Sequence, residues 1–281
     1  KDLDGIAATT GPGLVVCLHV GHNIGKSIAK FGGKSFLPIN HLEGHVLSPS
    51  LENKISFPYL LLLVSGGHSQ YLIVKNLNNY KQIGTTIDDA VGEAFDKTAK
   101  ILNLGYPGGP NIEKFAKLGD KNSYILPMPI INRGGCNLSL AGLKTDILRK
   151  SKDIKSNQEK YNLAASFQET INKILRKKTE VAMNEFRKKL SDNSRRAFVV
   201  AGGVAANKVL RKSLKEISIK MNFKPIFPSK EFCGDNAAMI AWAGIQRYKK
   251  KLFYKNNISV RSRWPLDENA PFLKGPGLKL E

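Results

Sequence analysis

The sequence predicts a mixed α/β fold built as two lobes. Strand-like and helix-like stretches are mixed along the chain, the order expected when helices cover sheets. A chain of 281 residues suffices for one large or two ordinary domains. With 42% apolar and 24% charged residues, the composition is that of a globular protein. The longest apolar run, residues 59–64, is far shorter than the roughly 20 residues of a membrane-spanning helix.

The first elements form a strand, helix, strand and helix. Residues 5–10 are strand-like and end in a Gly-Pro-Gly turn. Apolar residues at helical spacing then predict a helix that reaches Ala29. Residues 35–39 suggest a second short strand. Residues 41–51 have helical spacing that ends near Pro49, because proline cannot continue the helical hydrogen-bond ladder.

A hairpin follows. The apolar run at 59–64, a Ser-Gly-Gly-His turn and the run at 69–74 predict strand, turn and strand. Residues 83–86 suggest a third strand.

The next segment predicts one helix and a long loop. Asp88 or Asp89 is a candidate N-cap for a helix that runs to Leu102, whose apolar positions recur every three and four residues. The Pro-Gly-Gly-Pro segment at 107–110 breaks this helix. Residues 118–144 are rich in glycine and proline, so we expect them to be largely loop.

Basic amphipathic helices dominate the remainder of the chain. The predicted elements are, in order, a helix at 161–186, a strand at 197–201, a Gly202-Gly203 turn, a helix at 204–221, an extended stretch at 225–227 and a helix from Asp235 to about Lys250. In the first of these helices the basic residues are expected mostly opposite the apolar stripe; they are Lys173, Arg176, Lys177, Lys178, Arg187, Lys188 and Lys189.

The formal net charge is +21, from 44 Lys and Arg against 23 Asp and Glu. Such a basic surface favours a polyanionic partner, because binding to phosphates releases counterions. The alternative is that the lysines are scattered over solvated faces, and charge alone leaves both possibilities open.

The cysteines and the first residue bear on the setting of the protein. Cys17, Cys136 and Cys233 lie far apart without a C-x-x-C pair, which argues against a disulfide framework and a thiolate zinc site. A reducing cytoplasm fits this pattern. The chain begins with lysine rather than methionine and has no signal-peptide pattern, so we expect a fragment that lacks N-terminal residues.

His41 and His45 stand at positions i and i+4, which a helix places on one face with ring nitrogens able to share a metal ion. Glu43 points roughly 200° away from His41, so the general-base geometry of zinc-protease helices is missing. The alternative is a pair of surface or packed histidines. Asp235 is the best third ligand, because a carboxylate with two imidazoles suits iron(II) or zinc. Cys233 would be a softer ligand, although a small buried residue is its more ordinary role.

Glycine pairs follow two of the predicted strands, at Gly66-Gly67 and at Gly202-Gly203. Without a Cβ, such turns let backbone N–H groups approach a phosphate, and a following helix N-terminus adds positive potential. Strand corners also need glycine for ordinary reasons. The two pairs together, with Asp96 between them, favour nucleotide binding. Glu93 we expect instead to pair with Lys97 on a solvated helix face.

Taken together, these motifs resemble the bacterial TsaD-like tRNA N6-adenosine threonylcarbamoyltransferases, formerly described as O-sialoglycoprotein endopeptidases. The matching stretches are residues 10–14, 41–45, 63–68, 87–97, 106–110, 142–145, 202–207, 235–236, 259–261 and 263–266. They are spread over nearly the whole chain.

The resemblance implies an α/β fold of the actin, Hsp70 and sugar-kinase type, two lobes of duplicated ribonuclease H-like structure with a nucleotide cleft between them. In this chain the first strands of lobe I would be missing. Residues 1–55 would form the remainder of lobe I with the histidine helix, 56–240 would form lobe II with the glycine-loop site, and 241–281 would return to lobe I.

The resemblance also implies the site and the reaction. His41, His45 and Asp235 match the family's metal ligands, usually iron, with zinc as the other possibility. The positions that match the family's adenylate-binding residues are Leu63, Val64, Ser65, Gly66, Gly67, Asp96, Gly109 and Asn207. The expected reaction moves a threonylcarbamoyl group from threonylcarbamoyl-AMP to N6 of adenosine 37, in tRNAs that read codons beginning with A.

The implied partners are tRNA, a paralogous non-catalytic subunit and a small ATPase, in the cytoplasm and without a membrane. The basic helices at 173–189 and 208–224 then have tRNA as a natural ligand. Three rival interpretations remain: a metallopeptidase, an ATPase or sugar kinase of the same fold, and a non-catalytic scaffold. Glu43 is misplaced for the first, a two-histidine site is unneeded for the second, and retention of all three candidate ligands argues against the third.

Overall fold

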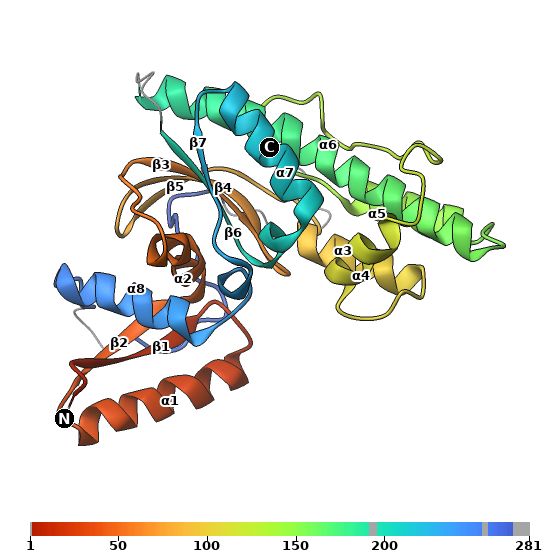
Figure 1. The fold of residues 1–281 in the computed structure, drawn as a ribbon. Coiled ribbons are helices and arrows are strands. Elements are labelled where there is room, and N and C mark those ends of the chain that lie inside the picture. The colour runs from red at the N-terminus through yellow and green to blue at the C-terminus, as the bar shows by residue number, and fades with distance from the viewer. Residues whose placement is uncertain (1, 191–195, 255–257, 272–281) are drawn as a thin grey trace.

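The computed structural model describes residues 2–190, 196–254 and 258–271. These residues form two separate sheets with helices between and around them (Figure 1). Within the described ranges, no helix combines the length and the apolar character that crossing a bilayer requires. The C-terminal part of the predicted third segment, residues 272–281, and residues 255–257 lie outside the description.

The smaller sheet pairs β1 (Gly5–Gly11) with β2 (Ser35–Asn40) in parallel. Two parallel strands need a crossover connection, which α1 (Val15–Phe31) supplies. The chain then continues directly from β2 into α2 (His41–Leu47), which is followed by a 3₁₀ turn at Ser48–Leu51.

The larger sheet has the strand order β5-β4-β3-β6-β7. Its strands are β3 (Tyr59–Val64), β4 (Ser69–Asn76), β5 (Asn79–Thr85), β6 (Ala197–Ala201) and β7 (Lys224–Ile226). β3, β4 and β5 form an antiparallel meander, whereas β6 and β7 run parallel to β3. The carboxyl ends of β3 and β6 therefore meet at one edge of the sheet, which is where the glycine turns lie.

β3 is buried on both faces and separates two hydrophobic cores. Leu60, Leu62 and Val64 face one core, and the alternate residues Leu61 and Leu63 face the other. All of β3 is buried, which explains why its sequence is a continuous apolar run rather than an alternating one.

Helices fill the two cores. On one side of the large sheet lie α3 (Val91–Ile101), α4 (Gly108–Ala116), α5 (Ala141–Ser151), α6 (Asn157–Leu190) and α7 (Lys208–Lys220). On the other side, α2 packs against α8 (Ala237–Lys249), and α8 packs on the β1–β2 pair. Figure 1 shows the resulting series from α1 through β1–β2, α8 and α2 to the large sheet and then α6 and α7. The short turns at Gly203–Ala206 and Lys230–Phe232 are 3₁₀.

Most predicted elements are confirmed, and the corrections have physical reasons. The N-cap of α3 is Ala90, not Asp88 or Asp89. Asp88 instead accepts hydrogen bonds from Ser139 Oγ (2.5 Å) and Leu140 N (2.7 Å), so it ties down a loop. These two partners are about 50 residues away in the sequence, so the local spacing around Asp88 does not reveal them.

Two helices were not predicted: α4, which lies just before the segment expected to be loop, and α5, which begins near the end of that segment. α4 begins inside the Pro-Gly-Gly-Pro segment, because prolines in a first helical turn lose no intrahelical hydrogen bond. α5 begins at Ala141 and buries Leu143 and Ile147, although its surroundings are rich in loop-forming residues.

The position of Lys178 also differs from the expected one. It lies on the buried side of α6, where its Nζ donates to the carbonyl oxygens of Arg133 (3.0 Å) and Gly135 (3.2 Å). Two backbone acceptors thus replace water around a cation that was expected on the solvated face.

The three-part division of the chain remains a proposal. Its first boundary, near residue 55, falls in the connection before β3, and its second, near residue 240, falls inside α8. α8 as a whole packs on β1 and β2.

Candidate functional site

α2 presents two histidines toward the loop before α8. Asn40 caps α2, because its Oδ1 accepts the Leu42 N–H at 2.8 Å while its Nδ2 donates to the Trp264 carbonyl at 2.9 Å. The helix that starts here brings His41 and His45 together, with ring centroids 4.8 Å apart. Their helical spacing is the one predicted from the sequence.

Asp235 completes a three-residue group. Its Oδ1 lies 3.0 Å from Nε2 of His45 and 3.5 Å from Nε2 of His41. One ligand atom from each residue lies within 4.8 Å of the other two. Metal–ligand bonds of about 2.0–2.2 Å place the donors of one ion roughly 3–4 Å apart, so the two carboxylate–imidazole distances match those around a single divalent ion.

Burial and charge keep two of the donors in their ligating forms. The pKa of His41 is lowered by burial and by His45, an effect that Asp235 opposes. The hydrogen bond with His45 lowers the pKa of Asp235, against the opposing effect of burial. Neutral imidazole and ionised carboxylate are the forms that bind a metal. The side chain of His45 is fully buried, whereas that of Asp235 is 75% exposed, so the group opens to solvent on one side.

Cys233 and Glu43 lie outside this group. Cys233 is buried and makes its sulfur contacts with Arg211 and the Ser229 carbonyl, the ordinary structural role of a small apolar residue. Glu43 is fully buried against Arg247 and Tyr80. It is therefore not available as the general base of a zinc protease, as its helical position predicted.

The two glycine turns lie side by side because β3 and β6 are parallel neighbours. Gly202 has a φ of +96°, and a Cβ there would lie 2.3 Å from the Val64 carbonyl oxygen. A Cβ at Gly92, in the first turn of α3, would lie 2.6 Å from the Ser65 carbonyl oxygen. Only glycine fits either position, so the end of β3 is held between two close backbone approaches.

A cavity of about 400 Å³ opens beside these turns. Of the predicted substrate residues, Gly66, Asp96, Gly109 and Asn207 line it. Oδ1 of Asp96 accepts the Gly108 N–H at 2.8 Å.

The remaining predicted substrate residues are placed differently. The side chains of Leu63 and Val64 are buried in the two cores. They line neither this cavity nor the neighbouring one that is described next. Asn207 uses its side chain within the protein, since Oδ1 accepts the N–H groups of Val209 and Leu210 and Nδ2 donates to Gln168.

A second cavity, of about 700 Å³, is lined by two of the three metal-ligand candidates. His41 and Asp235 line it together with the predicted residues Ser65, Gly66 and Gly67. Gly66 lines both cavities. The turn after β3 therefore lies between two spaces and borders both. One space is beside His41 and Asp235, and the other is beside Asp96.

Several lining residues were not predicted. His68 lines the larger cavity, and its pKa is lowered to about 4 by burial and by the nearby His41 and His45. It follows the glycine pair directly, which was a usable signal. Phe95, Glu113 and Lys230 line the smaller cavity, and they come from separate elements that no local pattern connects.

The basic helices have a more mixed surface than the sequence suggested. On α6, Arg176 pairs with Glu216 (3.4 Å) and Lys177 pairs with Glu180 (3.6 Å). On α7, the exposed lysines are Lys208, Lys212, Lys215 and Lys220. The acidic partners reduce the local positive potential of α6.

The comparisons with known proteins point to one family. Residues 1–242 match the model of the TsaD family, described as tRNA N6-adenosine threonylcarbamoyltransferase. A protein with this description from Pelagibacter ubique (strain HTCC1062) is 58% identical over 280 residues, covering 100% of this chain and 78% of the relative. One from Rickettsia rickettsii (strain Sheila Smith) is 48% identical over 269 residues, covering 95% of this chain and 78% of the relative.

Solved structures support the fold class. HypF from T. kodakarensis aligns with a TM-score of 0.61 at 14% identity, over 88% of this chain and 41% of that one. Full-length HypF in a phosphate- and nucleotide-bound form aligns with a TM-score of 0.59 at 14% identity, over 83% of this chain and 38% of that one. At this identity the likeness concerns the fold alone, and it confirms the predicted α/β class of the actin and Hsp70 type.

Proposed function

This chain belongs to the family of tRNA N6-adenosine threonylcarbamoyltransferases and is a tRNA-modifying transferase, and we propose how its cleft performs the transfer. The donor in this proposal is threonylcarbamoyl-AMP. The acceptor is N6 of adenosine 37 in tRNAs that read codons beginning with A, and AMP is released.

The proposal rests on Gly66, which lines both cavities. One cavity holds Asp96 and the glycine turns, and the other holds His41 and Asp235. A donor that has a nucleotide at one end and an acyl group at the other needs two adjoining spaces of different chemistry. The AMP end fits the first space and the threonylcarbamoyl end fits the second.

The smaller cavity suits the AMP end for local reasons. Gly66, Gly109 and Gly203 carry no Cβ there, so backbone can approach the ligand closely. Two helices, α4 and α7, begin beside this cavity, and their dipoles favour phosphate there, although Asp96, Glu113 and Asn207 already accept from amides of their first turns. Asp96 keeps one carboxylate oxygen on the Gly108 amide, and its other oxygen is suited to accept from a ribose hydroxyl.

His41, His45 and Asp235 would hold one divalent metal ion, which we propose to be iron(II), with zinc as the alternative. When bound, such an ion acts as a Lewis acid toward a carbonyl oxygen in its cavity. His68 is neutral at pH 7 because its pKa is about 4, so it adds no positive charge beside this group.

The transfer is one acyl substitution. The N6–C bond forms, the bond between the carbamoyl carbon and the phosphate oxygen breaks, AMP leaves with the bonding electron pair, and N6 loses one proton. The chain's contribution is to hold the two ends of the donor on either side of Gly66. A carbonyl fixed in this way meets the attacking amine with most of its rotational freedom already lost.

tRNA is the proposed partner of the basic helices, with α7 offering the exposed lysines. A paralogous non-catalytic subunit and a small ATPase complete the proposed assembly, in the cytoplasm, where its tRNA substrate is found. These partners rest on the family resemblance.

The experiment is a transfer assay with the protein, its partner subunits, threonylcarbamoyl-AMP and an unmodified tRNA transcript. Mass spectrometry of the digested tRNA should show threonylcarbamoyladenosine, and AMP should appear in equal amount. A transcript with guanosine at position 37 is the control and should stay unmodified. AMP release without modified nucleoside would indicate hydrolysis and contradict the proposal.

A further inference from the structure

A buried ion pair lies next to the histidine group and has no part in the chemistry described above. Glu43 stands between His41 and His45 in the sequence, and its side chain is fully buried. Nε of Arg247 donates to its Oε2 at 2.6 Å, and Nη2 donates to its Oε1 at 3.3 Å. The Tyr80 hydroxyl donates to Oε1 at 2.6 Å.

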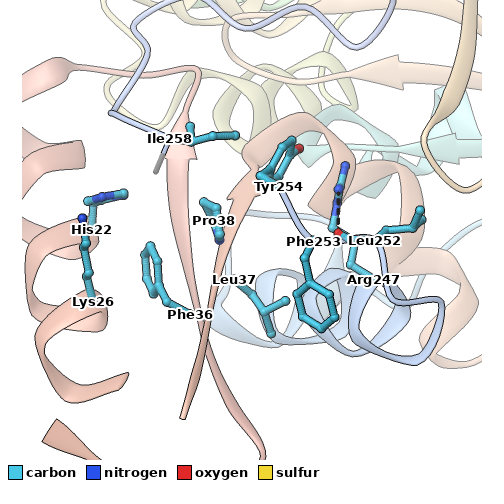
Figure 2. Close-up of a pocket in the computed structure, with 10 residues that line it drawn as sticks. All are labelled: His22, Lys26, Phe36, Leu37, Pro38, Arg247, Leu252, Phe253, Tyr254 and Ile258. Carbon is cyan, nitrogen blue, oxygen red and sulfur yellow. Dashed lines mark hydrogen bonds between the residues drawn. The ribbon is translucent and has the colours of Figure 1, made fainter. Parts of the chain in front are cut away.

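Arg247 is in turn held from several sides. Its Nη2 donates to Asn78 Oδ1 at 2.8 Å, its Nη1 donates to the Leu252 carbonyl at 3.4 Å, and its guanidinium lies 4.8 Å from the centre of the Tyr254 ring. Figure 2 shows Arg247 and Tyr254 together on the wall of a cavity of about 340 Å³, with the bond to Leu252 drawn. The partners of Glu43 are therefore themselves fixed.

Three successive residues of α2 meet α8 and the loop before it. His45 contacts Asp235, which lies just before α8. Gly44 packs on Ile240, where an added Cβ would come within 2.9 Å of that side chain. Glu43 contacts Arg247 near the end of α8. The ion pair and the histidine group thus join the same two parts of the chain at opposite faces of a seven-residue helix.

We propose that Glu43 is a positioning residue for the metal-ligand group. Its bonds to Arg247 and Tyr80 fix the rotation of α2, and so hold Nε2 of both histidines toward Asp235. A short helix has few hydrogen bonds of its own to resist rotation, and the distance between His41 and Asp235 depends on that rotation. Buried ion pairs add little stability over apolar residues of similar size, and fixing one arrangement is their best attested role.

This inference rests on the proposed metal site, and its test measures metal binding directly. The probe is Co²⁺, whose visible absorption reports ligand geometry, with Zn²⁺ as competitor. The variants are Glu43→Gln, which keeps size and removes charge, and Tyr80→Phe, which removes one hydrogen bond and keeps the ring. Residues outside the ligands that orient them typically change metal affinity by about 10- to 100-fold.

The matched control is Tyr71→Phe. The Tyr71 hydroxyl is also buried and hydrogen-bonded, to Thr179 at 2.9 Å, but on the α6 side of the large sheet. Its loss removes a hydrogen bond of the same kind without touching α2. Should Glu43→Gln fail to fold, Tyr80→Phe and Tyr71→Phe carry the comparison.

We expect the Kd for Co²⁺ to rise about tenfold or more in Glu43→Gln and about three- to tenfold in Tyr80→Phe, with a changed absorption spectrum, and to stay unchanged in Tyr71→Phe. Wild-type affinity and spectrum in both test variants would overturn the inference while leaving the metal site in place. An equal loss in Tyr71→Phe would also overturn it, because the effect would then be one of general stability. If the wild type binds no more Co²⁺ than a His41→Ala/His45→Ala variant, the proposed metal site fails and the inference fails with it.

Discussion

Nε2 of His45 lies 3.0 Å from Oδ1 of Asp235, although 190 positions of sequence separate the two residues. The contact forms because α2 packs on α8 and Asp235 stands just ahead of that helix. A histidine pair that α2 supplies locally thus acquires its carboxylate from the far end of the chain. The candidate metal group is a product of tertiary packing.

Asp235→Asn should weaken metal binding without unfolding the protein. The side chain is 75% exposed, so its burial contributes little to stability, whereas loss of its charge removes an anionic ligand. We expect bound metal to fall by about tenfold or more at limiting metal and Tm to stay within a few degrees. Metal content by mass spectrometry and a thermal melt check both. The control is Asp153→Asn, another exposed aspartate; full metal content in Asp235→Asn would remove Asp235 from the site.

Gly202→Ala should destabilise the protein, and Gly203→Ala should not. Gly202 has a φ of +96° and its Cβ would meet the Val64 carbonyl, whereas nothing lies within 4 Å of a Cβ at Gly203. We expect Gly202→Ala to lower the free energy of unfolding by about 1–3 kcal/mol. Urea denaturation of the two variants measures the difference. Equal stabilities would mean that the turn does not require this backbone conformation.

Stability should fall as the pH drops from about 6.5 toward 4, partly through His68. Its pKa in the folded protein is about 4, below the ordinary 6.5, so between these values the unfolded chain binds the proton and the folded one does not. Proton uptake then favours unfolding, by at most about 3 kcal/mol for this group. His68→Asn should flatten the dependence of unfolding free energy on pH in this window. An unchanged slope would show that the ring is solvated rather than desolvated in the folded state.

The Glu43–Arg247 pair should be strongly coupled in stability. Removing one partner leaves the other charge buried and unpaired, which costs about 3–5 kcal/mol, while removing both leaves no such charge. In a double-mutant cycle of Glu43→Gln and Arg247→Gln, we expect the double variant to lose less unfolding free energy than the two single variants lose together. The difference should be at least about 1 kcal/mol. Additive losses would mean that the two side chains act independently.

Binding of tRNA should depend steeply on salt, with α7 contributing more than α6. In a triple Lys208→Ala/Lys212→Ala/Lys220→Ala variant, the fall of log affinity with log salt should be less steep than in the wild type. The slope should decrease in magnitude by up to roughly 0.9 for each lysine that contacts phosphate. Lys177→Ala is the control, because Lys177 already pairs with Glu180. A slope that is flat in the wild type would assign these lysines to an ordinary solvated surface.

The local parts of the site were predictable from the sequence. Helical spacing placed His41 and His45 on one face and turned Glu43 away, and the glycine pairs marked the corners after β3 and β6. These features depend on residues close in sequence, where backbone geometry decides which side chains meet.

Long-range contacts were harder to predict. The Arg247 partner of Glu43, the carbonyl groups around Lys178 and the loop held by Asp88 all depend on segments distant in sequence. Side-chain type gave no signal of these partners, since a buried lysine and a solvated one look alike in a helical pattern. Asp88 was misassigned as a cap for the same reason.

Whether the histidine group takes part in the reaction can be decided by measuring transfer of labelled threonine from threonylcarbamoyl-AMP to unmodified tRNA, by the protein with its partner subunits, before and after chelation. We expect label on adenosine 37, its loss on chelation, its return on adding iron(II), and no transfer by a folded His41→Ala/His45→Ala variant. Full transfer by that variant, or transfer that chelation leaves unchanged in protein verified to be metal-free, would contradict a role for the histidine group in the reaction.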